Sequence, residues 1–377
     1  MTNATKIIGL TGNIATGKSV VRRMMSNSGG LGIDADFIAH RMLYPGGPAY
    51  EDVIAAFGED ILLPDQQISR RKLGKIVFGD PEKLTQLESL VHPPVTESIL
   101  QRIHRAQNPF VVIEAIKLIE AGLVDICDAV WVSHTTVSIQ LERLIQTRHL
   151  SETEANNRIY AQPPQSEKVS KADQVINTEG AFKDTWYQVQ RRLNDTIHSK
   201  GSDSTLNLSE ITSYSIKHAS LVSEQLLEDF WLKHAGEDLH RLYETLGMNM
   251  LLPVFQNDRL AYLIIWENWN FTAALNRIIP APPDRETASA LFAAFERQAQ
   301  AKQSEVLLLN KKTASKNAIE PAVFGFEQRK PEGLAYPAWQ SAVNRIGASS
   351  EKPMWTKIIA EPVELNGNII NGREQSV

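Results

Sequence analysis

The sequence predicts an α/β fold built on a parallel sheet, joined to a second domain of α+β type. Short apolar segments, typical of buried parallel strands, alternate with helical segments from residue 6 to residue 197. A glycine-rich motif follows the first of these strands at 12–19. The length of 377 residues suits two domains. Because 200–205 is small and polar, we expect domains at 1–199 and 209–377, with a linker at 200–208.

The glycine-rich motif matches the pattern G-x-x-x-x-G-K-[ST] at every fixed position. The backbone N–H groups of such a loop point at phosphate oxygens, its lysine reaches the β- and γ-phosphates, and its serine hydroxyl ligates Mg²⁺. A glycine-rich turn that matches by chance is the alternative, but the strand before it and the helix after it favour a true phosphate loop. The sequence therefore predicts nucleoside triphosphate binding by Gly12, Asn13, Ile14, Ala15, Thr16, Gly17, Lys18 and Ser19.

Asp36 stands at the carboxyl end of the second expected strand, 31–34, where a helix begins. Ligands of open α/β sheets bind outside the carboxyl ends of the strands. This carboxylate is therefore placed to face the phosphates and to accept the proton of an attacking hydroxyl. Aspartate is also a favoured helix N-cap, and the pattern alone does not choose between the two roles.

A helical region is expected between the second and third strands, where small-molecule kinases seat the phosphate acceptor. Its helices are expected at 49–57, 70–77 and 81–105, the last with a turn at 91–94. Arg70 and the basic residues that follow it can bind an anionic acceptor, or can form only a solvated helix face.

The rest of the first half continues the alternation of strands and helices. Strands are expected at 109–114, 128–133 and 172–177, a closing helix at 182–197, and helices with a capping box at Ser151 between 136 and 160. Arg143 and Arg148 lie on the latter helices, where a mobile lid can use arginines to offset charge on a transferred phosphoryl group. A role on the surface is the alternative for each.

These residues together resemble the dephospho-coenzyme A kinase family over about residues 6 to 197. The resemblance implies a P-loop NTPase fold like that of nucleoside-monophosphate kinases, with a helical acceptor insert and a lid. It implies transfer of the γ-phosphate of ATP, with Mg²⁺, to the ribose 3′-hydroxyl of dephospho-coenzyme A, the last step of coenzyme A synthesis. Outside the phosphate loop, the segments that match the family are 33–40, 45–46, 57–58, 69–74, 77–81, 87–93, 140–143, 161–162 and 172–176.

The resemblance also implies roles for single residues. It makes Asp36 the general base and Arg143 and Arg148 the lid arginines. His92 matches a His-Pro turn of the family's acceptor domain, with a packing role as the alternative.

The sequence departs from the family pattern at a few positions. Asn13 and Ala15 replace glycines of the loop, and Thr178 replaces an asparagine near the adenine. Lys117 lies in a segment that usually reads proline-leucine-leucine, where it can contact a phosphate of the substrate. None of these changes removes a group that the chemistry needs.

The second half resembles a GNAT-type acetyltransferase whose cofactor site is lost. The loop before its main helix, 280–285, is rich in proline, which has no N–H to offer a pyrophosphate. We therefore expect a non-catalytic module for packing, dimerisation or regulation, with Trp266, Trp269 and Trp339 in its core. Its elements are expected at 211–216, 219–232, 237–246, 248–255, 260–266, 285–300, 305–309, 318–324 and 354–359.

The composition limits the partners. A net charge of −5 without a long basic run gives no sign of nucleic-acid binding. No apolar run approaches the ~18 residues that span a bilayer, and no signal peptide precedes the loop, so we expect a cytoplasmic protein without membrane contact. The sequence carries no indication of the oligomeric state.

Three alternatives to the kinase prediction remain. The first is a nucleotide-binding regulatory protein whose catalysis has lapsed, with the second domain as its interaction module. The others are a different small-molecule kinase and a bifunctional kinase–acetyltransferase. The acceptor-domain motifs argue against the different kinase, and the proline-rich loop argues against the bifunctional enzyme.

Overall fold

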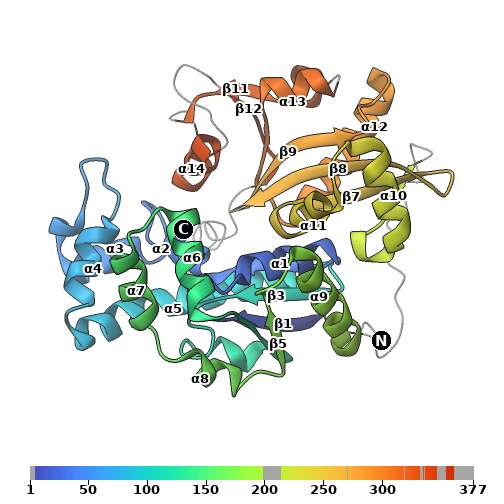
Figure 1. Cartoon of the computed structure of the whole chain (residues 1–377). Helices are drawn as coiled ribbons and strands as arrows, with labels where there is room; N and C mark the ends of the chain where they lie inside the picture. Colours follow the sequence, from blue (N-terminus) through green and yellow to red (C-terminus); the bar gives the residue numbers. More distant parts are fainter. Residues whose placement is uncertain are drawn as a thin grey trace.

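The chain folds around two sheets, shown in a computed structural model (Figure 1). The model describes residues 5–197, 214–269, 271–317, 319–331, 334, 336–345 and 354–360. The expected linker at 200–208 lies outside the described residues. The first sheet has the strand order β2-β3-β1-β4-β5, and the second has the order β11-β12-β10-β9-β8-β7-β6.

Every strand pair of the first sheet is parallel, as the sequence predicts. Alternate residues of its strands enter two separate cores: Val111 packs with α2 and α5 on one face, and Val112 packs with α1 and α9 on the other. The strands are β1 (Lys6–Thr11), β2 (Leu31–Asp34), β3 (Phe110–Glu114), β4 (Ala129–His134) and β5 (Gln174–Asn177).

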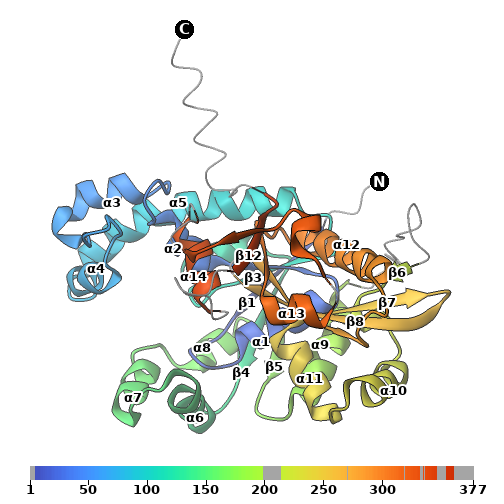
Figure 2. The same ribbon diagram turned by 90° about the horizontal axis from the view of Figure 1, so that it is seen from above.

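The helices of the first half fall into the expected groups. The acceptor insert (49–105) and the lid (136–160) lie apart from each other in Figure 2. The helices that cover the sheet are α1 (Lys18–Asn27), α2 (Ala35–Met42) and α9 (Phe182–Ile197). The insert contains α3 (Tyr50–Phe57), η1 (Glu59–Ile61), α4 (Arg70–Val77) and α5 (Pro81–His104); η2 (Leu123–Ile126), α6 (Val137–Arg148), α7 (Glu152–Tyr160) and α8 (Gln165–Val169) follow.

The expectation of a turn at 91–94 is wrong, because α5 runs without a break through Pro93 and Pro94. Each proline removes one backbone hydrogen bond of the helix. The helix continues because Val91, Val95 and Ile99 repeat at a spacing of four and all pack into the core beside α2.

Two helix caps in the first half follow the sequence chemistry. The Ser151–Glu154 capping box at the start of α7 is confirmed. Asp34 is the N-cap of α2, and its carboxylate accepts a hydrogen bond of 2.9 Å from the N–H of Phe37. Asp36 therefore lies inside the first turn of α2 and is not the cap.

The second half is an α+β domain with a mixed sheet. Its centre pairs β9 with β10 in parallel, and the other neighbours pair antiparallel. The strands are β6 (Tyr214–Ile216), β7 (Met250–Gln256), β8 (Arg259–Trp269), β9 (Thr272–Ile279), β10 (Val306–Leu309), β11 (Glu327–Arg329) and β12 (Met354–Ile358). The helices are η3 (Ala219–Leu221), α10 (Glu224–Ala235), α11 (Leu239–Met248), α12 (Arg285–Ala301), α13 (Lys311–Lys316), η4 (Pro321–Phe324) and α14 (Pro337–Arg345).

Some elements of this half differ from expectation. The single helix expected at 219–232 is two elements, because Ser223 caps a new helix by accepting from the N–H of Leu226. The short elements α13, β11 and α14 carry little periodic signal and were not predicted. Of the expected core tryptophans, Trp266 and Trp339 are buried, and Trp269 is partly buried.

The two halves share their hydrophobic cores. Figures 1 and 2 show the C-terminal domain seated over the first sheet, with α11 beside α1. Phe271 packs with the strands and α2 in one core, and Leu246 packs with α1 and α9 in the other. The boundary between the expected domains is therefore an extensive packed interface.

Polar groups at the end of α1 also bind the second half. Asn27 donates to the carbonyls of Leu246 and Asn249 at 2.8 and 2.9 Å and accepts from the N–H of Leu251 at 2.7 Å. Lys302 follows α12, and its ammonium donates to the carbonyl of Ser26 at 3.0 Å. Burial lowers the pKa of Lys302 to about 7.

Replacing Lys302 with methionine is expected to change how stability depends on pH. Between pH 7 and about 10 the unfolded lysine binds a proton that the folded one has lost, so wild-type stability rises with pH. We expect wild type to gain up to about 1.4 kcal/mol per pH unit relative to Lys302→Met in this window. Chemical denaturation at several pH values measures it, with exposed Lys316→Met as the control.

A difference between wild type and Lys302→Met that stays constant across this window would contradict the prediction. The neighbouring titratable group, His218, does not interfere. Burial and the charge of Lys302 lower the pKa of His218 to about 4 from 6.5, so its contribution changes only below the window.

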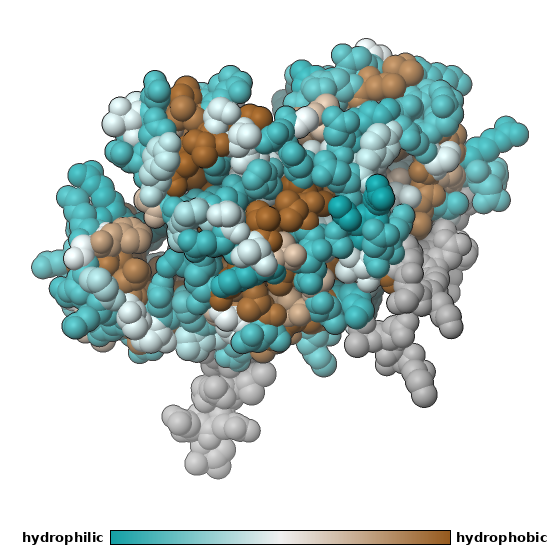
Figure 3. Space-filling model, turned by 60° about the horizontal axis from the view of Figure 1, so that its bottom comes forward, coloured by the Kyte–Doolittle hydropathy of each residue, from teal (hydrophilic) through white to brown (hydrophobic). Residues whose placement is uncertain are grey.

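The surface is mixed in character. On the face drawn in Figure 3, hydrophobic residues gather in several patches surrounded by hydrophilic ones. Among the described residues, no helix combines the length and the apolar character that crossing a bilayer requires.

Candidate functional site at the strand ends

The carboxyl ends of the parallel strands bring the predicted site residues together. The phosphate loop follows β1, Asp36 follows β2, and Glu114 ends β3 between them in the sheet order. Parallel strands end at one edge of a sheet, so these groups share one side of the fold. The strand-end rule thus places Lys18, Asp36 and Glu114 in one site.

The phosphate loop has the backbone that its motif predicts. Gly12 and Gly17 adopt positive φ values of 149° and 83°, and Ala15 also lies in the left-handed region at 58°. Lys18 is buried, and its ammonium donates to the carbonyls of Gly12 and Asn13 at 2.9 and 3.0 Å. Burial lowers the pKa of Lys18, although the charges of Glu114 and Asp36 counteract it.

The segment that follows α7 binds this loop through one side chain and one backbone carbonyl. Gln162 accepts from the N–H of Ile14 at 2.7 Å, and Asn13 donates to the carbonyl of Pro163 at 2.8 Å. Glycine, which the family resemblance implies at position 13, could not make this bond. The departure at Asn13 therefore ties the loop to the segment beyond α7.

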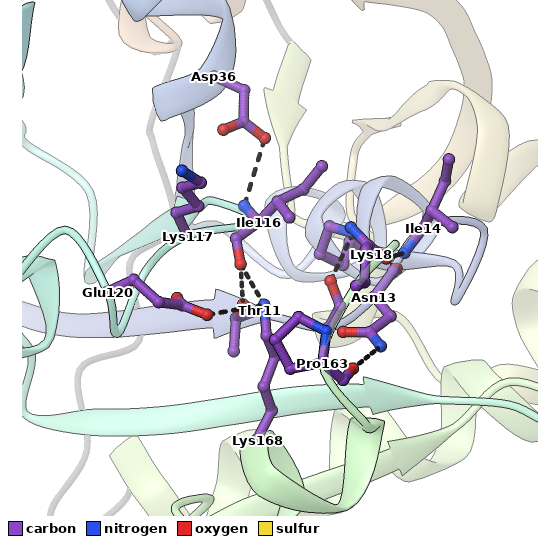
Figure 4. Close-up of polar contacts among 12 residues, drawn as sticks. Thr11, Asn13, Ile14, Lys18, Asp36, Ile116, Lys117, Glu120, Pro163 and Lys168 are labelled. Atoms are coloured by element: carbon purple, nitrogen blue, oxygen red, sulfur yellow. Dashed lines mark hydrogen bonds and ion pairs between the residues drawn. The ribbon is translucent and has the colours of Figure 1, made fainter. Parts of the chain in front are cut away.

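Asp36 lies opposite the phosphate loop, close to the end of β3. Its carboxylate accepts a hydrogen bond of 3.3 Å from the N–H of Ile116, and in Figure 4 it points toward that backbone. Burial raises the pKa of Asp36, although this N–H and the charge of Lys18 counteract the shift. A carboxylate with a raised pKa is a better proton acceptor.

Glu114 was not among the predicted site residues. Its carboxylate accepts from the hydroxyl of Ser19 at 2.8 Å and from Nε of Arg22 at 2.5 Å. Burial opposes its ionisation, but Arg22 and Lys18 outweigh burial and hold the pKa of Glu114 below its usual value. The strand-end rule that selected Asp36 selects Glu114 as well.

Lys168 was also missed, and no local sequence signal marks it. It comes from α8, and its ammonium donates to the carbonyl of Ile116, the residue whose N–H binds Asp36 (Figure 4). Glu120 lies 3.7 Å from the same ammonium. Burial lowers the pKa of Lys168, and the charges of Glu120 and Asp36 counteract it. Lys168 is thus a buried cation beside Asp36.

The two predicted lid arginines lie in different surroundings. Arg143 is held against the phosphate loop, where it donates to the carbonyl of Ala15 at 3.1 Å and to both oxygens of Thr178. Arg148 is exposed at the end of α6. The structure therefore places Arg143 at the base of the loop and leaves Arg148 on the lid surface.

The residues predicted to bind the phosphate acceptor lie outside the cluster formed by Lys18, Asp36 and Glu114. Lys117 forms an exposed ion pair of 2.6 Å with Glu88 on α5, and His92 is half-buried on the same helix. Arg70 lines a cavity of about 190 Å³ together with His40, Tyr44, Leu43, Gln67 and Ile68. Burial and the charge of Arg70 lower the pKa of His40 to about 4.

Thr178 acts as a structural residue of the loop. It is buried, and its hydroxyl donates to the carbonyl of Thr16 at 2.9 Å. A Cβ atom on Gly17 would lie 3.1 to 3.2 Å from three atoms of Thr178. A side chain at position 17 would therefore press on Thr178.

Alanine at position 17 is expected to destabilise the protein more than alanine at position 236. Both glycines lie in the left-handed region, Gly17 at φ 83° and ψ 15° and Gly236 at φ 69° and ψ 24°, which costs an L-residue about 1–2 kcal/mol. Gly236 has open space around its Cβ position, whereas a Cβ on Gly17 presses on Thr178, adding about 1–3 kcal/mol of overpacking. Thermal unfolding of Gly17→Ala and Gly236→Ala measures the difference, and equal losses would contradict the contact argument.

The loop at 280–284 of the C-terminal domain leads into the capped start of α12. Asp284 caps α12, accepting from the N–H of Thr287 at 2.8 Å. A carboxylate at this helix start competes with any phosphate for the same donors. Pro280, Pro282 and Pro283 contribute no N–H.

Comparison with known structures finds similarity to proteins of two kinds. A solved dephospho-CoA kinase from Campylobacter jejuni is 27% identical, covering 51% of this chain and 96% of that chain with a TM-score of 0.39. An acetyltransferase from Streptococcus agalactiae is 14% identical, covering 39% of this chain and 99% of that one with a TM-score of 0.26.

A family model described as dephospho-CoA kinase matches residues 6–184. The dephospho-CoA kinase of Bacillus licheniformis is 43% identical over 192 residues, which are 50% of this chain and 96% of that protein. The one from Carboxydothermus hydrogenoformans is 45% identical over 186 residues, 48% of this chain and 90% of that protein. The chain therefore belongs to the dephospho-CoA kinase family.

Proposed function

We propose that this chain transfers the γ-phosphoryl group of ATP to the ribose 3′-hydroxyl of dephospho-coenzyme A, giving coenzyme A and ADP. One observation carries the proposal: the phosphate loop with Lys18 and the carboxylate of Asp36 lie at the same strand-end site, joined through the end of β3. Family membership supplies the identity of the nucleotide and the acceptor.

Each group of the site has a role in this reaction. The loop N–H groups and Lys18 bind the β- and γ-phosphates. Asp36 accepts the proton of the attacking 3′-hydroxyl, which its raised pKa favours. Arg148 on the lid and Lys168 beside Asp36 offset negative charge as the phosphoryl group moves.

The donors present fit a magnesium ion. The hydroxyl of Ser19 and the carboxylate of Glu114 are hard oxygen ligands 2.8 Å apart, and Mg²⁺ is usually held by one or two such groups together with substrate phosphates. When bound, Mg²⁺ neutralises charge on the β- and γ-phosphates. Arg22 keeps Glu114 ionised and so ready to serve as a ligand.

The acceptor is proposed to bind between the site and the helical insert. Arg70, His92 and Lys117 remain the candidates for its contacts, and Lys117 would have to leave Glu88 to reach a phosphate. An exposed ion pair of this kind is worth at most about 1 kcal/mol, so a substrate phosphate can replace it.

The regulatory alternative has less support than the kinase. Lys18, Ser19 and Asp36 are all in place, and Thr178 replaces the family's asparagine with a residue that orders the loop. We further propose that the C-terminal domain is non-catalytic, as the proline-rich loop capped by Asp284 suggests, and that the protein acts in the cytoplasm.

The test is conversion of dephospho-coenzyme A to coenzyme A with Mg-ATP, followed together with ADP release. Turnover is expected in wild type, lost in Lys18→Ala and kept in Lys6→Ala, whose lysine forms an exposed ion pair outside the site. A folded protein that binds ATP but leaves dephospho-coenzyme A unchanged would refute the kinase and favour the regulatory alternative.

A further inference from the structure

Helix α2, which carries Asp36, is bound along one face by the C-terminal domain. Phe37 and Arg41 are four residues apart, so they lie on the same face of the helix. The ring of Phe37 packs against Phe271 at 5.6 Å between centroids, and the guanidinium of Arg41 lies 5.2 Å from the same ring. Asp36 directly precedes Phe37, so any shift of this face moves its carboxylate.

The same face of α2 is also held by Glu305, which directly precedes β10. Nη1 of Arg41 lies 2.9 Å from both of its carboxylate oxygens, and Nε1 of Trp339 donates to one of them at 2.9 Å. Nη2 of Arg102, on α5, lies 3.5 Å from the other oxygen. The side chain of Glu305 is 2% exposed, so this carboxylate joins α2, α5 and α14 in the interior.

Burial makes this arrangement rigid. Charged groups removed from water are costly unless their partners are placed correctly, so a small displacement loses interaction that solvent cannot replace. The ring of Phe271 closes the cluster, 3.5 Å from the guanidinium of Arg102. Helix α2 cannot slide along its axis without drawing Arg41 away from Glu305.

We propose that the C-terminal domain positions the kinase site, and that Glu305 is the positioning residue, acting through Arg41 on helix α2 and therefore on Asp36. The inference rests on the proposed function. The family model matches residues 6–184, and the two relatives are covered to 90–96% by matches of 186 to 192 residues. The support from Glu305 thus comes from a part of the chain that the family model does not include.

The expected effect is on turnover more than on nucleotide binding. The carboxylate of Asp36 is held at 3.3 Å from the N–H of Ile116, and a misplacement of about 1 Å can cost about 10²-fold in rate. Lys18 and the loop are fixed by their own contacts. Glu305→Gln should therefore lower kcat about tenfold or more and leave KM for ATP within about twofold.

The test combines kinetics with hydrogen–deuterium exchange of the backbone at 35–42. Glu305→Gln removes the charge, and Arg41→Lys keeps a charge but loses the planar guanidinium, whose Nη1 lies 2.9 Å from both oxygens. Glu237→Gln is the matched control, since Glu237 forms an exposed ion pair with Arg277 in the same domain. We expect faster exchange at 35–42 and lower kcat in the first two variants and neither in the control.

Unchanged kcat in a folded Glu305→Gln protein overturns the inference, whether or not exchange at 35–42 is faster. A lower kcat with exchange raised evenly over the whole chain also overturns it, because that result indicates general loosening. If Glu305→Gln does not fold, Arg41→Lys decides by the same criteria. If wild type does not convert dephospho-coenzyme A, the proposed function fails, and exchange at 35–42 alone still decides whether Glu305 holds α2.

Discussion

Asparagine in place of Asp36 is expected to lower kcat by about 10²–10⁴-fold, the usual contribution of a general base. Asparagine has nearly the same shape and its oxygen can still accept from the N–H of Ile116 at 3.3 Å, so the helix start should not move. The phosphate loop has its own contacts, so affinity for ATP should stay within about twofold.

The pH dependence of turnover checks the role assigned to Asp36. A base must be ionised to accept a proton, and burial raises the pKa of this carboxyl above its usual 3.8. Wild-type kcat should therefore fall on the acid side as the carboxyl becomes protonated, and the residual activity of Asp36→Asn should lack this limb. Exposed Asp195→Asn on α9 is the control. Turnover close to wild type in Asp36→Asn would refute the role.

Local pattern was enough to predict the centre of the site. The phosphate loop is contiguous in sequence, and the strand-end rule needs only the order of strands and helices, so Lys18 and Asp36 could be found without coordinates. Glu114 meets the same rule and was overlooked. Lys168 could not be found this way, because its place beside Asp36 depends on how α8 folds back over the sheet.

The contacts of Arg143 and Arg148 could not be predicted from the sequence pattern. Periodicity places Arg143 and Arg148 on one helix but does not tell which will find a partner. Arg143 meets Thr178, which lies 35 residues away, and becomes part of the loop's support, whereas Arg148 stays exposed. The fold of the first half was predicted well, except at α5, where a buried face outweighs two prolines, and at the short helix α8, which was not predicted.

Contacts between the halves were beyond sequence reasoning. Arg41 and Glu305 are 264 positions apart, and Asn27 and Leu251 are 224 apart. Neither pair carries a motif: Arg41, Glu305 and Asn27 each read as an ordinary surface residue, and Leu251 contributes only its backbone N–H. The sequence therefore predicts two separable domains, with residues 1–200 able to fold as a kinase alone.

The structure leads us to expect a different result for that truncation. Phe37 packs against Phe271, and a Cβ on Gly247 of α11 would lie 2.7 Å from the ring of Phe182. Val20 on α1 touches the same position at 3.1 Å. Each such side chain loses up to roughly 1.5–3 kcal/mol when it becomes exposed again.

Those losses are comparable with the whole stability of a domain, roughly 5–15 kcal/mol. The exposed apolar face would in addition promote association between fragments. We expect a chain ending at Lys200 to be largely insoluble, or to unfold at least about 10 °C below the full chain. Expressing 1–200 together with 209–377 shows whether the fragment fails because it lacks the contacts with the second domain or because the chain is cut. If the contacts matter, co-expression should restore a soluble kinase.

A fragment 1–200 that is monomeric, as stable as the full chain and fully active would show that the C-terminal domain is dispensable. That result would remove the basis for a positioning role of Glu305.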